Sequence, residues 1–279
     1  MIHIEDLSFS YRGETRPALE HITLTVPDGG FLGIIGPAGA GKTTLARAIS
    51  GIIPHHYPGD YYGSVTVNGL DTVDTPLIDL SRQVGMVFQD VESQIISSVV
   101  EDEILYGLEN FGVPKEEIPR RIDEALRQAG IADLRDRSIS SLSGGQRQKV
   151  AIASIVALRP RVLALDEPTG ELDPRSSRQV FQLMKALNEE TGITVIIVEQ
   201  KIMLLCEFAR QLAVLSGGRI CRQGETREVL AHAEELENVG VNCPRVVTLS
   251  RILTEKTGEQ QPVCVNLDEA EKMARRFIP

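Results

Sequence analysis

The sequence of 279 residues lacks the long apolar runs and the basic charge that mark several classes of protein. No run approaches the roughly 18 apolar residues of a membrane-spanning helix, so we expect that the chain itself does not cross a membrane. No basic segment followed by an apolar one opens the chain, which argues against an export signal. The net charge of −10 disfavours a protein that binds DNA or RNA, because such proteins usually carry a basic stripe.

Cysteines in the spacing of a metal site are also missing. The chain has four scattered cysteines, Cys206, Cys221, Cys243 and Cys264. Without an export signal, we interpret them as reduced thiols of a cytosolic protein that pack as small buried hydrophobic residues. We interpret the pair His55 and His56 as a solvated surface feature. What is present is ordinary for a globular protein with an ample core, since 42% of the residues are apolar and 24% are charged.

The pattern of apolar residues predicts an α/β fold. Residues 2–9 and 20–27 are interpreted as antiparallel strands, and residues 51–63, rich in proline, glycine and aromatic residues, as a loop. Short apolar strands are predicted at 31–35, 84–88, 162–165, 193–198 and 211–215. Helical patterns begin near Leu45, fill most of 92–158 and return at 175–188. This order predicts a mostly parallel core with an antiparallel β lobe and a helical insert at about 90–158.

A change of composition around residues 225–242 predicts a second unit. Polar, helix-forming segments there lead into two further helical patterns. The last of them begins with a capping signal, Asn266 followed by Glu269 three residues later. We therefore predict a boundary near residue 230, which divides the chain into a domain at 1–230 and a small C-terminal helical extension at 231–279.

A glycine-rich segment between a predicted strand and a predicted helix carries the strongest chemical signal. Residues 36–43 read Gly-Pro-Ala-Gly-Ala-Gly-Lys-Thr and fit the eight-residue phosphate loop. The backbone N–H groups of residues 39–43 are expected to hold a β-phosphate, and Lys42 to neutralise the phosphate oxygens. The Thr43 hydroxyl is expected to hold Mg²⁺. The residues assigned to the nucleotide here are Gly36, Gly39, Ala40, Gly41, Lys42, Thr43 and Thr44.

Two acidic residues, Asp166 and Glu167, end the apolar strand at 162–165. A carboxylate at the end of a buried strand can hold Mg²⁺ with its water, and the next carboxylate points elsewhere. We assign Asp166 to the metal and Glu167 to a general base or to the orientation of the attacking water. Because Lys42 is present, this interpretation is preferred to a plain structural acid pair.

Residues 142–146 read Leu-Ser-Gly-Gly-Gln and precede an apolar helical pattern. Such a turn would offer free backbone N–H groups and the positive end of a helix dipole to an anion. The phosphate loop lies about a hundred residues earlier. Two phosphate-binding loops in one chain suggest a nucleotide that is gripped from both sides by two copies of the fold.

These motifs, in this order, resemble the ATPase subunits of ATP-binding cassette (ABC) transporters over about residues 1–225. The resemblance implies a P-loop NTPase core, ATP and Mg²⁺ as cofactors, and two cassettes that close head to tail. The signature residues that would serve the ATP of the other subunit are Ser143, Gly144, Gly145 and Gln146.

Three further positions match that family. The match implies that Tyr11 stacks on adenine, although an aromatic residue of the strand core remains the alternative. It implies that Gln89 senses Mg²⁺ and water, and that Asp173 couples the two sites.

One residue of the family pattern is replaced. After the strand at 193–198 the family usually carries a histidine that contacts the γ-phosphate, and here Gln200 takes that position. A neutral amide can donate a hydrogen bond, but it cannot carry the proton or the charge of an imidazole. We therefore predict that the site built on Lys42 hydrolyses ATP slowly or only binds it. The alternative is that Gln200 replaces the histidine adequately.

Residues 89–114 are similar to a segment of the ATPases of energy-coupling factor (ECF) importers, with Val91 in place of a common proline and Ile95 and Ile96 in place of Leu-Phe. In that family the segment forms a groove for a helix of the transmembrane coupling subunit. The alternative is an amphipathic helix packed on its own domain. Residues 240–274 resemble the C-terminal helical extension that contributes to dimerisation of these ATPases.

The resemblance thus implies an ATPase on the cytoplasmic face of the cell membrane that powers the import of a vitamin or a transition-metal micronutrient. The implied partners are a second ABC ATPase, the coupling subunit and, indirectly, a substrate-binding membrane subunit, without nucleic acid. An intact signature in the same chain as Gln200 favours a heterodimer in which one ATP site is much more active than the other. The alternatives are the ATPase of another ABC importer or exporter and a soluble ABC clamp, against which the intact Glu167 argues.

Overall fold

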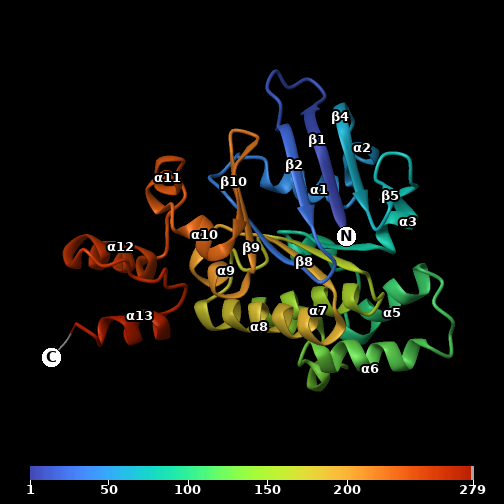
Figure 1. The fold of residues 1–279 in the computed structure, drawn as a ribbon. Coiled ribbons are helices and arrows are strands. Elements are labelled where there is room, and N and C mark those ends of the chain that lie inside the picture. Colours follow the sequence, from blue (N-terminus) through green and yellow to red (C-terminus); the bar gives the residue numbers. More distant parts are fainter. Residues whose placement is uncertain (278–279) are drawn as a thin grey trace.

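The molecule is built around a six-stranded sheet, and the computed structural model describes residues 1–277 (Figure 1). The strand order is β10-β9-β3-β8-β7-β6. The strands are β3 (Phe31–Ile35), β6 (Val84–Val87), β7 (Val162–Asp166), β8 (Thr194–Val198), β9 (Gln211–Ser216) and β10 (Arg219–Glu225). All are parallel except β10, which pairs antiparallel with β9. The predicted mostly parallel core is confirmed.

Both faces of this sheet are covered, which explains why its central strands are continuous apolar runs. Every residue of β3, β7 and β8 is buried. Ile197 and Leu165 pack into the cluster that contains the apolar residues of α7 and α8, whereas their neighbours Ile196 and Ala164 pack towards the antiparallel lobe. Successive side chains of a strand point to opposite faces of the sheet, so every residue of the apolar run is buried on one face or the other.

The antiparallel lobe has the strand order β2-β1-β4-β5. Its strands are β1 (Ile2–Tyr11), β2 (Leu19–Val26), β4 (Gly59–Val67) and β5 (Leu70–Asp71), with α2 (Ile52–His55) and α3 (Leu77–Ser81) beside them. The two predicted N-terminal strands are confirmed, but the prediction of a loop over 51–63 is wrong. Residues from Gly59 onwards pair with β1, and this pairing outweighs the turn-forming composition of the segment.

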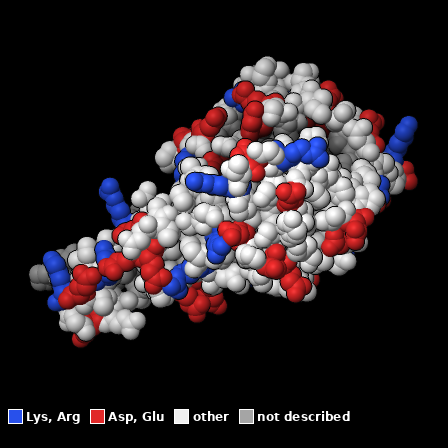
Figure 2. Space-filling view, turned by 90° about the horizontal axis from the view of Figure 1, so that it is seen from above, with Lys and Arg blue, Asp and Glu red and all other residues white. Residues whose placement is uncertain are grey.

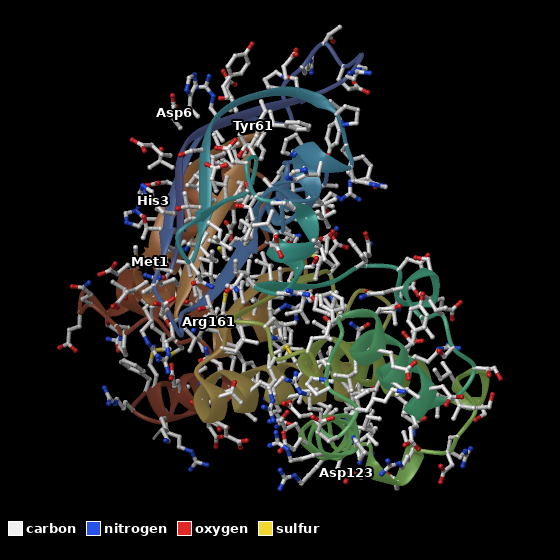
Figure 3. All side chains as sticks on the ribbon, turned by 90° about the vertical axis from the view of Figure 1, so that its right-hand side faces the viewer. Met1, His3, Asp6, Tyr61, Asp123 and Arg161 are labelled. Atoms are coloured by element: carbon white, nitrogen blue, oxygen red, sulfur yellow. The ribbon has the colours of Figure 1, made fainter. Side chains whose placement is uncertain are left out.

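The helical insert follows β6. It contains α4 (Val91–Gln94), α5 (Val100–Asn110), α6 (Ile118–Gln128), two short 3₁₀ turns (Ala132–Leu134 and Ile139–Ser141) and α7 (Gly144–Val156). In Figure 3, Asp123 marks α6 of the insert, while His3 and Asp6 mark β1 at the opposite end of the molecule. The insert is mainly helical, as predicted, and α7 links it to the core by packing against α5, α8 and β6.

Helices α8 (Pro174–Thr191) and α9 (Ile202–Phe208) complete the core. Four helices, α10 (Thr226–Leu230), α11 (Ala233–Asn238), α12 (Arg245–Thr257) and α13 (Leu267–Ala274), then lead away from the insert (Figure 1). Asn266 caps α13 by accepting a hydrogen bond from the Glu269 amide, as predicted. Within residues 1–277 no helix has the length and apolar character needed to cross a bilayer.

The four cysteines are free thiols. Cys206 and Cys264 are buried, as predicted, and Cys243 is half-buried. Cys221 is exposed, so the prediction that all four pack as buried hydrophobic residues is wrong there. Cys221 lies on β10, the edge strand, where no residue is fully buried.

Candidate functional site

Four predicted site segments follow the carboxyl ends of neighbouring parallel strands. Gly36 follows β3, Gln89 lies two residues after β6, Asp166 ends β7, and Gln200 lies two residues after β8. Because parallel strands all end at the same edge, the sheet brings these segments together. In open α/β sheets this edge is where ligands bind.

The phosphate loop turns from β3 into α1 (Lys42–Ile49), which begins three residues before its predicted start at Leu45. Gly41 precedes the helix with a φ of 98°, in the left-handed region that favours glycine. A Cβ at Gly41 would lie 2.4 Å from the carbonyl oxygen of Ala18. The close approach of the two backbones therefore requires glycine at this position.

Lys42 lies over the loop and is almost fully buried, with 5% of its surface exposed. Its Nζ donates to the carbonyl oxygens of Gly36 and Pro37, both at 2.9 Å. Burial lowers the pKa of Lys42, and the negative charges of Glu167 and Asp166 act in the opposite direction. Two carbonyl oxygens of the loop therefore hold the ammonium group over it.

Thr43 and Asp166 form an oxygen pair next to the loop. Thr43 Oγ1 donates to Asp166 Oδ1 at 3.1 Å, and burial raises the pKa of Asp166. Hydroxyl and carboxylate oxygens suit Mg²⁺, which proteins usually bind through one or two carboxylates together with substrate phosphates. Residues 1–277 contain no group of three or more His, Cys, Asp and Glu side chains arranged for a metal ion. The pair thus fits an ion that is bound together with a nucleotide.

The carboxylate of Glu167 is the point where three of the predicted residues meet. Gln89 Nε2 donates to its Oε2 at 3.1 Å, and Gln200 Nε2 donates to its Oε1 at 2.6 Å. The Glu167 backbone has a φ of 46°, uncommon for a residue with a side chain, and its N–H donates to the carbonyl oxygen of Val198 at 2.9 Å. Such strained backbones cluster at functional sites. Each oxygen of this carboxylate is held by one amide.

These three side chains line a cavity of about 970 Å³. Gly144 of the signature segment also borders it, so the cavity lies between the core and the start of α7. A carboxylate that faces a cavity of this size can contact water, which is what a general base for hydrolysis requires.

The signature segment forms the N-terminus of α7. Ser143 N–H donates to Gln146 Oε1 at 2.9 Å, and Gln146 N–H donates to Ser143 Oγ at 3.4 Å, which completes a capping box. The amides of Gly144 and Gly145 lie in the first turn, so they have no acceptor within the helix and are open to an anion. Within the described chain no hydrogen bond joins residues 143–146 to the phosphate loop. The structure does not bring the two loops of one subunit together.

Asp173 caps α8. Its carboxylate accepts hydrogen bonds from the amides of Arg175 and Ser176 at 2.9 and 3.1 Å and from the Ser176 hydroxyl, and these bonds, that of the Ser176 side chain foremost, lower the pKa of Asp173. A Cβ on Gly145 would lie 2.9 Å from Ser176, so the signature helix packs directly against the start of α8. Asp173 is thus engaged within its own subunit, next to the signature.

Tyr11 ends β1 beside the phosphate loop. Its hydroxyl lies 3.1 Å from Thr44 Oγ1. Its half-buried ring meets Phe9 and Tyr57 edge to face, with centroids 4.9 and 6.1 Å away. The ring therefore packs on the lobe core, while its hydroxyl reaches the helix that follows the phosphate loop.

Two residues around Gln200 were missed by reasoning from the sequence. Glu199 is 1% exposed and receives four hydrogen bonds. Lys201 Nζ donates to the carbonyl oxygens of Thr169 and Leu172. An acidic residue directly after an apolar strand is the signal that identified Asp166, and the same signal at Glu199 could have found it.

The segment 89–114 forms α4, an extended link and α5. Gln94 ties the link to the core, since its side chain accepts from Phe88 N–H and donates to the Met86 carbonyl oxygen. Glu103 accepts from the amides of Ile96 and Ser97 at 2.9 and 2.7 Å. The link is thereby held in a shape that leaves the Ile96 side chain 66% exposed.

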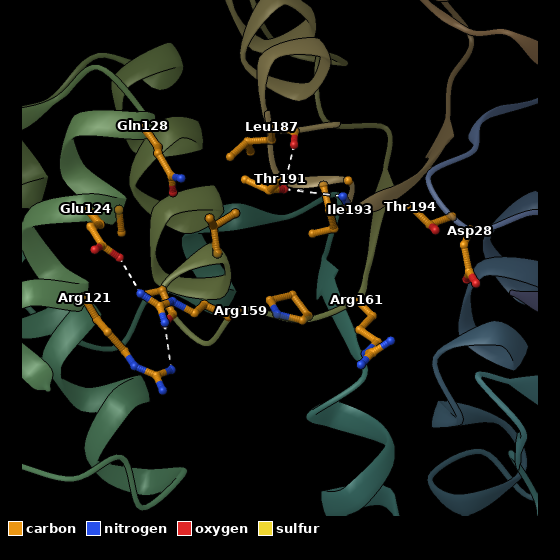
Figure 4. Close-up of a pocket in the computed structure, with 15 residues that line it drawn as sticks. Asp28, Arg121, Glu124, Gln128, Arg159, Arg161, Leu187, Thr191, Ile193 and Thr194 are labelled. Carbon is orange, nitrogen blue, oxygen red and sulfur yellow. Dashed lines mark hydrogen bonds and ion pairs between the residues drawn. The ribbon is translucent and has the colours of Figure 1, made fainter. Parts of the chain in front are cut away.

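Other features of the surface do not involve the predicted site. On the face shown in Figure 2, acidic and basic side chains are interspersed. A second cavity, of about 570 Å³, lies between α6 and the start of β8 (Figure 4). Two of the three arginines that line it, Arg121 and Arg159, form ion pairs with Glu117 and Glu124 respectively. None of the residues predicted for nucleotide binding or catalysis lines it.

Comparisons with known proteins agree with this geometry. A family model described as ABC transporter matches residues 19–170. A relative from Pyrococcus horikoshii, named as an ABC transporter ATP-binding protein, is 39% identical over 275 residues, which are 99% of this chain and 96% of that protein. A relative of the same kind from Methanosarcina acetivorans is 39% identical over 253 residues, which are 91% of this chain. The chain spans only 40% of the length of that second protein.

Two solved structures are similar in fold as well. One is cbiO1 from Clostridium perfringens, described as part of the ABC transporter complex cbiONQ, with a TM-score of 0.76 and 32% identity over 88% of this chain and 96% of that chain. The other is the ATP-binding cassette MJ0796, a dimer in a post-hydrolysis state bound to ADP and Pi. Its TM-score is 0.70, with 28% identity over 81% of this chain and 99% of that chain.

Proposed function

The chain belongs to the family of ABC transporter ATPases, and we propose that it powers an ECF-type importer for a vitamin or a transition-metal micronutrient. Members of this family bind and hydrolyse ATP and act as dimers together with transmembrane subunits. The observation that carries the catalytic assignment is the convergence of Gln89 and Gln200 on Glu167. The similarity to cbiO1, part of the complex cbiONQ, supports the importer type.

We assign ATP to the phosphate loop at residues 36–44. Lys42 neutralises the phosphate oxygens, and Tyr11 stacks on the adenine. Thr43, Asp166 and Gln89 are the residues that would hold Mg²⁺. When bound, the ion neutralises charge on the phosphate oxygens.

Glu167 acts on the attacking water as general base or orients it. The amides of Gln89 and Gln200 keep its two carboxylate oxygens in place, which limits the carboxylate to one direction. Such positioning is worth much in catalysis, because reacting groups must lie within a few tenths of an ångström of the productive geometry.

The signature segment of this chain is proposed to serve a nucleotide on the partner ATPase. Ser143, Gly144 and Gly145 would bind its γ-phosphate, Gln146 would maintain the capped turn, and Asp173 would couple the two sites. The open amides of the first turn of α7 support this, as does the absence of a hydrogen bond from this segment to the phosphate loop within residues 1–277.

We further propose that the partner is a different ABC ATPase and that the extension at 231–279 contributes to the contact between the two. This chain would supply an intact signature to the ATP on the partner's phosphate loop, while the ATP on its own phosphate loop would face Gln200. The more active site would then be the one on the partner's phosphate loop. The assembly would lie peripherally at the cytoplasmic face of the cell membrane.

Replacing Gln200 by histidine tests the assignment of a slow site. An imidazole can carry a charge, and a charge-assisted hydrogen bond adds about 1.5 kcal/mol or more. In a complex whose partner site is inactivated, we therefore expect Gln200→His to raise hydrolysis at the site built on Lys42 about tenfold or more. The gain should depend on pH near 6.5, the ordinary pKa of histidine. Steady-state phosphate release between pH 5.5 and 8.5 measures both.

The matched control is Gln200→Asn, which keeps an amide but shortens it and should not raise the rate. An unchanged rate in Gln200→His would show that the glutamine already replaces the histidine adequately. In that case the proposal of a slow site is wrong, while the assignment of the chain as an ATPase stands.

The importer type is tested at the exposed link of the segment 89–114. We expect Ile96→Glu to abolish recovery of the chain with membrane subunits, because a charge would enter an apolar contact at a cost of several kcal/mol. Co-purification of the full chain from membranes of its native host measures this. ATP binding by the purified variant should stay within twofold of the wild type.

Ile78→Glu is the matched control, since Ile78 on α3 is 52% exposed and lies outside the segment. If both variants are recovered with membrane subunits as well as the wild type, the segment is not the docking site. The amphipathic packing of α5 on its own domain would then be its whole role.

A further inference from the structure

Glu199 joins two loops that meet at the catalytic carboxylate. Its Oε1 accepts from Thr169 N–H at 3.0 Å and from Thr169 Oγ1 at 2.6 Å. Its Oε2 accepts from the amides of Gln200 and Lys201 at 3.1 and 3.3 Å. One oxygen therefore holds the loop that follows Glu167, and the other holds the loop that carries Gln200.

Every polar contact of the Glu199 carboxylate is made within this arrangement. Three of its partners are backbone N–H groups, which can only donate, and the fourth is the Thr169 hydroxyl. Burial raises the pKa of Glu199, and the four hydrogen bonds act in the opposite direction. A buried carboxylate costs several kcal/mol unless it is satisfied in this way, so its retention points to a specific role.

Lys201 ties the same two loops a second time. Its Nζ donates to the carbonyl oxygens of Thr169 and Leu172, at 2.5 and 2.9 Å. The loop between these carbonyls leads to Asp173 and the start of α8. Movement of either loop would therefore be transmitted to the other.

We propose that Glu199 is a positioning residue for hydrolysis: it holds the Gln200 amide against Glu167 and fixes the loop 168–173 to the same point. This inference rests on the proposed role of Glu167. Glu199 would not contact ATP or the attacking water, and it would act on the rate only through Gln200 and the loop it anchors.

Glu199→Gln tests the proposal with the least change of shape. In either orientation its NH₂ group faces a backbone N–H of one loop, so one anchor is lost. We expect kcat of the full chain to fall about tenfold, as for the loss of a charge-assisted hydrogen bond, with KM for ATP within twofold. Amide hydrogen exchange should rise about tenfold or more at 168–173 and 199–203 while β7 and β8 stay protected.

Two comparisons separate positioning from a general loss of stability. Thr169→Val removes one donor and Thr169→Ser keeps it, so only the valine variant should reproduce the lower kcat and the local exchange. Glu190→Gln, at an exposed position of α8, should match the wild type in every measurement. In a Gln200→Ala background, Glu199→Gln should lower kcat by less than about twofold, because the group it positions is absent.

The proposal is overturned if Glu199→Gln leaves kcat and local exchange unchanged, if it lowers kcat equally in the Gln200→Ala background, or if exchange rises throughout β7 and β8. A failure of the proposed function gives a different result. Glu167→Gln would then leave turnover unchanged, while the exchange measurements would still report whether Glu199 anchors the two loops.

Discussion

Replacing Glu167 by glutamine is expected to lower ATP turnover of the purified full chain by about 10²- to 10⁴-fold, the usual contribution of a general base. The amide keeps the shape of the side chain and can still pair with Gln89 or Gln200, but it cannot take a proton from water. The dissociation constant for ATP should change by less than about threefold, because the phosphate loop is untouched. Phosphate release and equilibrium binding of ATP measure the two effects separately.

Glu171→Gln is the matched control. Glu171 is exposed and lines the same cavity, but it forms no hydrogen bond or ion pair among the residues that the structure describes. We expect it to retain the wild-type rate. The same fall for Glu167→Gln is expected in a Gln200→His background, since a histidine would assist the base without replacing it. Turnover within threefold of the wild type in Glu167→Gln would contradict the assignment of the base.

Lys42→Met is expected to weaken ATP binding about 10- to 100-fold. Methionine keeps much of the apolar stem that is buried under the loop, but it removes the ammonium group. Charge-assisted hydrogen bonds contribute about 1.5 to 3 kcal/mol each, and 1.4 kcal/mol corresponds to a factor of ten in affinity. Isothermal titration of the full chain with Mg²⁺ and ATP measures the change.

One observation and one control variant make this prediction specific to the Lys42 ammonium group. Lys42 Nζ lies 2.9 Å from two carbonyl oxygens of its own loop, so the loop itself holds the ammonium group in place. Lys185→Met, at an exposed lysine of α8, removes the same charge without touching the loop and should leave the affinity unchanged. An affinity within twofold of the wild type in Lys42→Met would show that the loop binds phosphate through its backbone alone.

Local motifs predicted most of the candidate site. The phosphate loop, the acid pair at 166–167 and the signature at 142–146 are continuous in the chain, and each requires a strand end or a helix N-terminus that neighbouring residues already specify. The capping box of Ser143 and Gln146 shows this, because it is made within four residues. Such features can be read without knowledge of the rest of the fold.

Non-local pairing explains where prediction failed. Gly59 to Tyr62 read as a loop, but they form β4 because β1 lies beside them and supplies partners for their backbone. The contact between Glu199 and Thr169 was missed for a similar reason. Two of the four donors of Glu199 belong to Thr169, 30 positions away, so only the fold shows that this carboxylate joins two loops.

The chemistry available to this protein follows from its local sequence motifs: a cationic loop for phosphates, a strand-end acid pair, a helix N-terminus open to an anion, and an amide in place of a histidine. Which of these groups meet depends on the fold. The sheet order places β6, β7 and β8 side by side, so Gln89 and Gln200 reach Glu167 from 78 and 33 residues away. The same fold keeps the signature segment unbonded to the phosphate loop within residues 1–277. Strand neighbours are set by burial of both sheet faces, which no single segment encodes.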